Sequence, residues 1–130
     1  MKSLIVEDDS ISSLVLVELL KPLGTVEAFE SGQPAIDAIQ RGLSADKPYD
    51  LVCLDIMLPD MDGHEILKAI RIAEMDAGYP IGRGSKIVMV TALRDKTNVM
   101  NAFRSACDGY LPKPFDRARL HELLLSLGLP

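Results

Sequence analysis

Short apolar runs alternate with amphipathic stretches along the whole 130-residue chain. A bounded apolar run predicts a strand, whereas apolar residues recurring three and four positions apart predict a helix. The predicted strands are residues 2–6, 25–29, 51–54, 86–90 and 109–111. The predicted helices are residues 10–20, 34–41 and 63–74, one beginning near Thr97 and one beginning after Asp116. Five strand–helix alternations indicate one doubly wound α/β domain, in which helices cover both faces of a parallel sheet.

The third predicted strand, residues 51–54, is apolar throughout, which is typical of a central strand buried on both faces. Asp55 follows it directly, at the carboxyl end of the strand, where open α/β sheets bind their ligands. Burying a carboxylate there is costly unless a positive charge compensates it. We therefore expect a metal ion or a cationic side chain near Asp55.

The first predicted helix has more apolar residues than one face needs. Its core face is expected to consist of Val15, Leu16, Leu19 and Leu20. Ile11 and Leu14 then remain outside the core, beside the acidic end of the first strand. Exposed apolar groups at that place predict a docking surface for a partner protein, to which we also assign Pro114 and Phe115.

Composition narrows the class of protein. The net charge of −5 and the lack of a Lys/Arg-rich run argue against direct nucleic-acid binding. No apolar stretch approaches the ~20 residues that span a bilayer, and no signal peptide precedes the first strand. Cys53 and Cys107 lie in predicted core segments without metal-ligand spacing, so we interpret them as small buried hydrophobes of a cytoplasmic protein. The glycines of residues 75–85 follow a helix and precede a strand, which is not the arrangement of a nucleotide-binding loop.

Polar residues gather where the predicted strands end. They are Glu7 and Asp8 after the first strand, Asp55 after the third, Thr91 after the fourth and Lys113 after the fifth. Because parallel strands end at one edge of the sheet, three carboxylates would meet there and repel one another unless a cation binds. Mg²⁺ suits such oxygen ligands, and a hydroxyl with an ammonium group suits a phosphoryl group.

Four segments in this order resemble the receiver domain of bacterial response regulators over essentially the full length, residues 1–130. The segments are Val6-Glu7-Asp8-Asp9, residues 55–63, Val90-Thr91-Ala92 and Gly109-Tyr110-Leu111-Pro112-Lys113-Pro114-Phe115. The resemblance implies a flavodoxin-like fold with strand order 2-1-3-4-5. It also implies a phosphoprotein of two-component signalling, either a single-domain regulator or part of a longer protein, which takes a phosphoryl group from a sensor histidine kinase or a histidine phosphotransfer protein.

The resemblance assigns roles to individual residues. Asp55 would be the phosphoacceptor, and Thr91 and Lys113 would contact the phosphoryl oxygens. Asp8, Asp55 and the Met57 carbonyl would bind Mg²⁺ directly, with Glu7 acting through water. Lys113–Pro114 would be a cis peptide. Tyr110 would turn inward when Thr91 moves and so repack the surface of the fourth helix, fifth strand and fifth helix for a downstream target protein.

Two other classes of function compete with this interpretation. A Mg²⁺-dependent phosphatase or hydrolase with an aspartate nucleophile needs a second Asp two residues after the first, where this chain has Met57. A pure interaction module would have no need for Asp55, Thr91 and Lys113 together. We therefore expect no enzyme beyond the protein's own phosphorylation and dephosphorylation, and a monomer or a weak phosphorylation-dependent dimer.

The sequence also predicts a slow loss of the phosphoryl group. Met57 and Leu93 each follow a phosphate-contacting residue by two positions. Neither side chain can hold a water molecule for attack by hydrogen bonding. We expect a longer-lived aspartyl phosphate than in relatives with polar residues at these positions.

Overall fold

Five parallel strands form one sheet in the order β2-β1-β3-β4-β5, in a computed structural model that describes residues 1–56, 58–80, 82–92 and 107–130. The strands are β1 (Lys2–Val6), β2 (Thr25–Phe29), β3 (Leu51–Asp55), β4 (Lys86–Ala92) and β5 (Gly109–Lys113). The helices are α1 (Ser10–Leu20), α2 (Gly32–Ser44), α3 (Gly63–Asp76) and α5 (Arg117–Ser126), with a short 3-10 helix at Lys21–Leu23. The predicted fold class and strand order are confirmed. The helix predicted near Thr97 lies outside the described residues.

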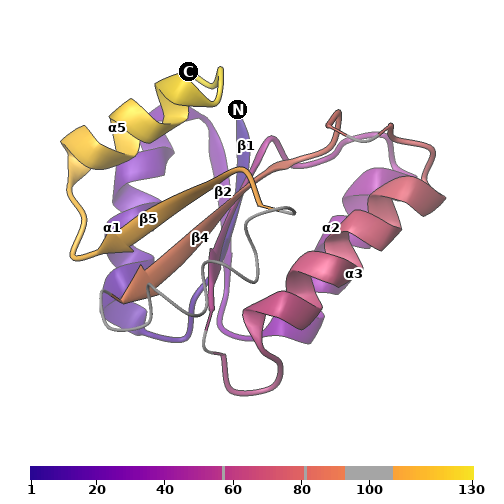
Figure 1. Cartoon of the computed structure of the whole chain (residues 1–130), viewed down its shortest axis with the longest axis horizontal. Coiled ribbons are helices and arrows are strands. Elements are labelled where there is room, and N and C mark those ends of the chain that lie inside the picture. The colour runs from indigo at the N-terminus through magenta and orange to yellow at the C-terminus, as the bar shows by residue number, and fades with distance from the viewer. Residues whose placement is uncertain (57, 81, 93–106) are drawn as a thin grey trace.

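Helices cover both faces of the sheet, as Figure 1 shows: α1 and α5 lie on one side, and α2 and α3 lie on the other. The core divides in the same way, because successive residues of a strand point to opposite faces. In β3, Leu51 and Cys53 pack toward α1 and α5, whereas Val52 and Leu54 pack toward α2 and α3. These four side chains are fully buried, as predicted for a central strand.

The first helix buries less of its surface than its sequence pattern predicts. Leu16 and Leu20, one turn apart, are fully buried, but Val15 is 40% exposed, so its assignment to the core was wrong. Neighbouring residues on a helix point about 100° apart, and Val15 turns away from the sheet toward the connection between β5 and α5. Ile11 and Leu14 are 73% and 61% exposed, as predicted.

Two element boundaries differ from prediction for reasons of packing. Gly42 was expected to end the second helix but lies inside α2, where a Cβ would approach the Lys47 carbonyl oxygen to 2.9 Å. Pro112 was expected to end the last strand, yet it pairs with Thr91 inside β5. An edge strand needs ladder hydrogen bonds on one side only and so accepts a proline.

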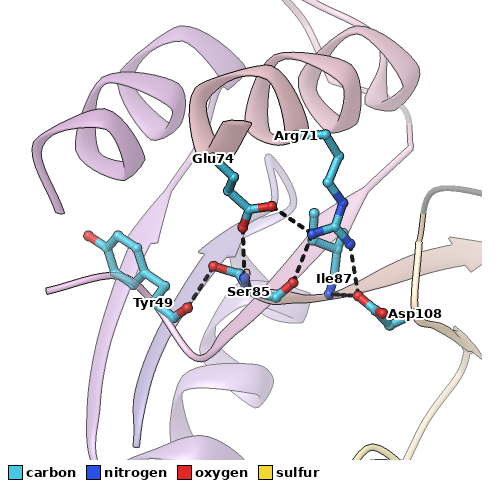
Figure 2. Close-up of polar contacts among 6 residues, drawn as sticks. All are labelled: Tyr49, Arg71, Glu74, Ser85, Ile87 and Asp108. Atoms are coloured by element: carbon cyan, nitrogen blue, oxygen red, sulfur yellow. Dashed lines mark hydrogen bonds and ion pairs between the residues drawn. The ribbon is translucent and has the colours of Figure 1, made fainter. Parts of the chain in front are cut away.

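A polar network closes the amino-terminal edge of the sheet, opposite Asp55 (Figure 2). Buried Glu74 of α3 accepts hydrogen bonds from the Ser85 N–H at 2.7 Å and from Arg71 Nη1 at 2.9 Å. Arg71 also donates to the Ser85 carbonyl at 3.0 Å and to Asp108 Oδ2 at 2.9 Å. Asp108 Oδ2 in turn accepts from the Ile87 N–H at 2.8 Å. The network joins α3 to the beginnings of β4 and β5.

No helix of the described residues is long and apolar enough to cross a membrane.

Candidate functional site

Three acidic residues meet at the carboxyl edge of the sheet. The Glu7 N–H donates to the Phe29 carbonyl at 2.9 Å, which extends the pairing of β1 with β2 and holds Glu7 in a buried position. Asp8 is exposed, and Asp55 ends β3 with 9% of its surface exposed. Oxygen atoms of Glu7, Asp8 and Asp55 lie within 4.8 Å of one another. The structure thus brings together the acids that the sequence places at separate strand ends.

Lys113 of β5 lies beside these acids. Its Nζ is 2.7 Å from Glu7 Oε1 and 4.0 Å from Asp55 Oδ2. The Lys113–Pro114 peptide is cis, as the family resemblance implies. A cationic side chain therefore accompanies Asp55, as expected from the cost of burying that carboxylate.

Glu7 and Lys113 shift each other's pKa in opposite directions. Burial by itself raises the pKa of Glu7. Hydrogen bonds with the Asp55 side chain, the Lys113 ammonium and the Asp9 N–H lower it, and the net pKa is below its usual value. Burial by itself lowers the pKa of Lys113, but Glu7 and Asp55 raise it, and its net pKa is above its usual value. Glu7 and Lys113 therefore form an ion pair at this edge of the sheet.

The acid cluster fits a hard divalent cation. Mg²⁺ prefers carboxylate oxygens and keeps several of its waters. Glu7, Asp8 and Asp55 supply such oxygens close enough to face one ion, and the exposure of Asp8 leaves one side open to water. Met57, whose carbonyl the resemblance implies as a further ligand, lies outside the described residues, as does Leu93.

Thr91 and Tyr110 project from the same face of the sheet. Tyr110 pairs with Met89, two residues before Thr91 along β4, and both Met89 and Tyr110 pack in the core on the α2/α3 side. Because side chains alternate along a strand, Thr91 points to this face as well. Thr91 is buried, and its hydroxyl donates to the Ala92 carbonyl at 3.1 Å. A movement of Thr91 would therefore affect the face of the sheet on which Tyr110 lies.

Three of the four predicted docking residues, Ile11, Pro114 and Phe115, line a groove next to Lys113. The groove has a volume of about 350 Å³ and is lined by Ile11, Ser12, Val15, Lys113, Pro114 and Phe115. Leu14 is exposed on α1 but does not line it. Val15 belongs to this surface although the sequence pattern placed it in the core. Its inclusion could not be foreseen, because the helical spacing of apolar residues does not say which of two adjacent residues faces the sheet.

Asp60, in the loop between β3 and α3, has no local sequence pattern that predicts its contacts. Its carboxylate accepts hydrogen bonds from the Gly32 N–H at 2.8 Å and the Gln33 N–H at 3.0 Å, at the beginning of α2. A surface aspartate between Pro59 and Met61 looks like any polar loop residue, and its partners are 27 and 28 positions away.

Comparisons with known proteins agree with this geometry. The family model of the response regulator receiver domain matches residues 3–125. The osmosensing histidine protein kinase SLN1 of Saccharomyces cerevisiae is 32% identical over 125 residues, which are 95% of this chain and 10% of that protein. The chain thus spans about a tenth of the length of this curated relative.

Two solved structures are similar over almost the whole chain. The receiver domain of the sensor histidine kinase PA1611 from Pseudomonas aeruginosa, with a magnesium ion in its active site cleft, is 29% identical with a TM-score of 0.76, and the match covers 98% of this chain and 97% of that one. The receiver domain of the histidine kinase CKI1 from Arabidopsis thaliana, complexed with Mg²⁺ and BeF₃⁻, is 25% identical with a TM-score of 0.83 and coverages of 98% and 89%.

Proposed function

Because the chain belongs to the response regulator receiver domain family, we propose that it is a Mg²⁺-dependent phosphoacceptor of a two-component phosphorelay. Asp55 takes the phosphoryl group from a phosphohistidine of a sensor kinase or of a histidine phosphotransfer protein. The observation that supports this best is the meeting of Glu7, Asp8, Asp55 and Lys113 at one edge of the sheet.

The transfer exchanges one bond to phosphorus for another. A carboxylate oxygen of Asp55 attacks the phosphorus atom, the new O–P bond forms, and the N–P bond to the imidazole breaks. Lys113 lies close enough to Asp55 to pair with an oxygen of the transferred group, and Thr91 offers a hydroxyl from the neighbouring strand. Asp8 and Asp55 would hold Mg²⁺ directly and Glu7 would hold it through water, and the ion would neutralise charge on the phosphoryl oxygens. Glu7 also holds the Lys113 ammonium in place.

The phosphorylated form then signals through its surface. Thr91 moves toward the phosphoryl group, and Tyr110, on the same face of the sheet, follows it. The predicted surface for a downstream target protein, of which the structure describes β5 and α5, then changes shape and binds that protein. A kinase or phosphotransfer protein docks at the groove beside Ile11 and Phe115, next to the acidic edge. The similarity to histidine kinase receiver domains supports this kind of partner.

We propose that the protein makes no direct contact with nucleic acid. Its location is cytoplasmic, which suits the free thiols of Cys53 and Cys107, and it is a monomer or a weak phosphorylation-dependent dimer. The proposal also includes no turnover of an external substrate, because an aspartyl-nucleophile hydrolase would need an acid where this chain has Met57.

Incubation with Mg²⁺ and a small acyl phosphate, followed by intact mass spectrometry, tests the proposal. We expect one acid-labile phosphoryl group on the wild-type protein and none on Asp55→Asn, which keeps the size of the side chain. Asp50→Asn is the matched control, since Asp50 is an exposed aspartate just before β3, and it should be labelled like the wild type. Catalytic release of phosphate without a labelled protein would favour the hydrolase, and absence of both would leave a bare interaction module.

A further inference from the structure

We infer that Asp60 is a positioning residue of the acceptor site: it fastens the loop after β3 to the beginning of α2 and so restrains the segment that follows Asp55 relative to the segment that hydrogen-bonds Glu7. The inference rests on the proposed function and deepens it. Asp60 itself contacts no residue of the acid cluster among the described hydrogen bonds, so it acts through the backbone segments that it joins.

The beginning of α2 depends on Asp60. The first N–H groups of a helix have no partner within the helix and need a cap. Ser31 occupies the N-cap position of α2 but makes no side-chain capping bond, and Pro34 has no N–H to offer. The two carboxylate oxygens of Asp60 take the Gly32 and Gln33 N–H groups instead, and these bonds lower the pKa of Asp60 below its usual value.

The loop also packs closely against the first turn of α2, at Gly32. A Cβ at Gly32 would lie 2.8 Å from Ile66 Cδ1 and 2.9 Å from Met61 Sδ. Met61 also packs against the core on the α2/α3 side. A side chain at Gly32 would displace the ends of the Ile66 and Met61 side chains, so Met61 as well as Asp60 lies against the first turn of α2.

The other described hydrogen bonds of this loop join residues that are close together in the sequence. The Gly63 N–H donates to the Ile56 carbonyl at 2.8 Å across the base of the loop, and Asp62 caps α3 by accepting from the Glu65 N–H at 2.9 Å. These bonds shape the loop and its entry into α3. Among the described residues, only Asp60 joins it to α2 by hydrogen bonds.

The Asp60 hydrogen bonds connect two segments of the chain, each of which leads to an acid of the site. On one side the loop continues directly from Asp55. On the other side, the start of α2 follows Phe29, whose carbonyl accepts the Glu7 N–H at 2.9 Å. β1 and β3 pair up to Val6 and Leu54, so the sheet itself holds the strands together. Loss of the Asp60 bonds loosens the segments beyond the strands, one of which follows Asp55 while the other hydrogen-bonds Glu7 through Phe29. Residues that orient metal ligands indirectly change metal affinity by about 10–100-fold.

The decisive experiment separates capping of α2 from positioning of the site. Asp60→Ala removes both effects. The double variant Asp60→Ala with Ser31→Asp restores a cap for the Gln33 N–H from within α2, but it leaves the loop unfastened. Asp37→Ala is the matched control, because it removes an exposed carboxylate from α2 that bonds only the Gln33 side chain among the described hydrogen bonds. For each protein we would measure the melting temperature without Mg²⁺, the Kd for Mg²⁺ by calorimetry, and the hydrogen exchange rate of the Glu7 amide.

We expect Asp60→Ala to lower the melting temperature, to weaken Mg²⁺ binding by about tenfold, and to speed exchange of the Glu7 amide. The added Ser31→Asp should restore the melting temperature while leaving Mg²⁺ binding weak and exchange fast. Asp37→Ala should behave like the wild type. If Asp60→Ala unfolds, Asp60→Asn, which keeps one oxygen acceptor, gives the same comparison.

Recovery of Mg²⁺ affinity by Ser31→Asp, or unchanged affinity and exchange in Asp60→Ala, would overturn the inference and reduce Asp60 to a helix cap. A wild-type protein that binds no Mg²⁺ would instead refute the proposed function. The exchange rate of the Glu7 amide would then still decide whether Asp60 holds the two segments together.

Discussion

Removal of the Arg71 guanidinium should cost more stability than any other loss of a surface charge on α3. Arg71→Met keeps an unbranched apolar stem, but it removes contacts to Glu74, Asp108 and the Ser85 carbonyl (Figure 2). Glu74 then remains as a buried carboxylate with only the Ser85 N–H as a partner among the described hydrogen bonds.

The size of the effect follows from burial. Breaking a buried ion pair by removing one partner costs about 3–5 kcal/mol. The side chain of Glu74 is 7% exposed, whereas those of Arg71 and Asp108 are each 28% exposed, so water reaches part of the network. We therefore expect a loss of about 3 kcal/mol in the free energy of unfolding, at the low end of that range. For a domain of this size the melting temperature should fall by about 10 °C.

The cause can be isolated by a double-mutant cycle in urea. Glu74→Gln removes the negative charge but keeps an oxygen to accept from the Ser85 N–H. Added to Arg71→Met, it should restore about 1–2 kcal/mol, because the uncompensated charge is gone. Lys68→Met, which removes an exposed cation from the same helix, should change the stability by no more than about 0.5 kcal/mol. If Glu74→Gln further destabilises the Arg71→Met protein, the buried charge is not the source of the loss.

Three further outcomes are expected. Millimolar Mg²⁺ should raise the melting temperature, because a hundredfold excess over Kd adds about 2.7 kcal/mol to the free energy of unfolding. Asp8→Ala should make this increase smaller. Equal melting curves with and without the ion would refute the metal site. Ile11→Ala should slow phosphotransfer from the kinase but not labelling by a small acyl phosphate, whereas Ile72→Ala, an exposed isoleucine on α3, should change neither; equal slowing of both reactions by Ile11→Ala would indicate damage to the site. Met57→Asn and Leu93→Glu, singly and together, should speed loss of the phosphoryl group in acid-quenched labelling, and an unchanged rate in the double variant would show that these positions do not control access of water.

The strand pattern and the positions of the acids could be predicted because both depend on local sequence. Every residue from Leu51 to Leu54 is apolar, which only a strand covered on both faces requires. Once the strands are parallel, their carboxyl ends share one edge, and the strand order β2-β1-β3-β4-β5 then brings Glu7, Asp8, Asp55 and Lys113 near one another. The family resemblance implied that order.

Helix orientation and element ends depended on packing. Val15 and Leu16 are equally apolar, and only the rotation of α1 against the sheet decides that Leu16 is buried while Val15 lines the groove. Pro112 reads as the end of a strand until the sheet order places β5 at an edge, where its missing N–H is tolerated.

The sequence by itself determined the fold class and the chemistry at the strand ends, since hydrophobic periodicity and chain order suffice for both. Only the tertiary structure decided which polar residues join distant segments of the chain. Asp60 pairs with Gly32 across 28 positions, and Arg71 pairs with Asp108 across 37. A carboxylate or guanidinium on the surface of a loop or helix has the same local pattern whether it meets water or a distant backbone N–H. Its role is fixed only when folding brings the partner within hydrogen-bonding distance.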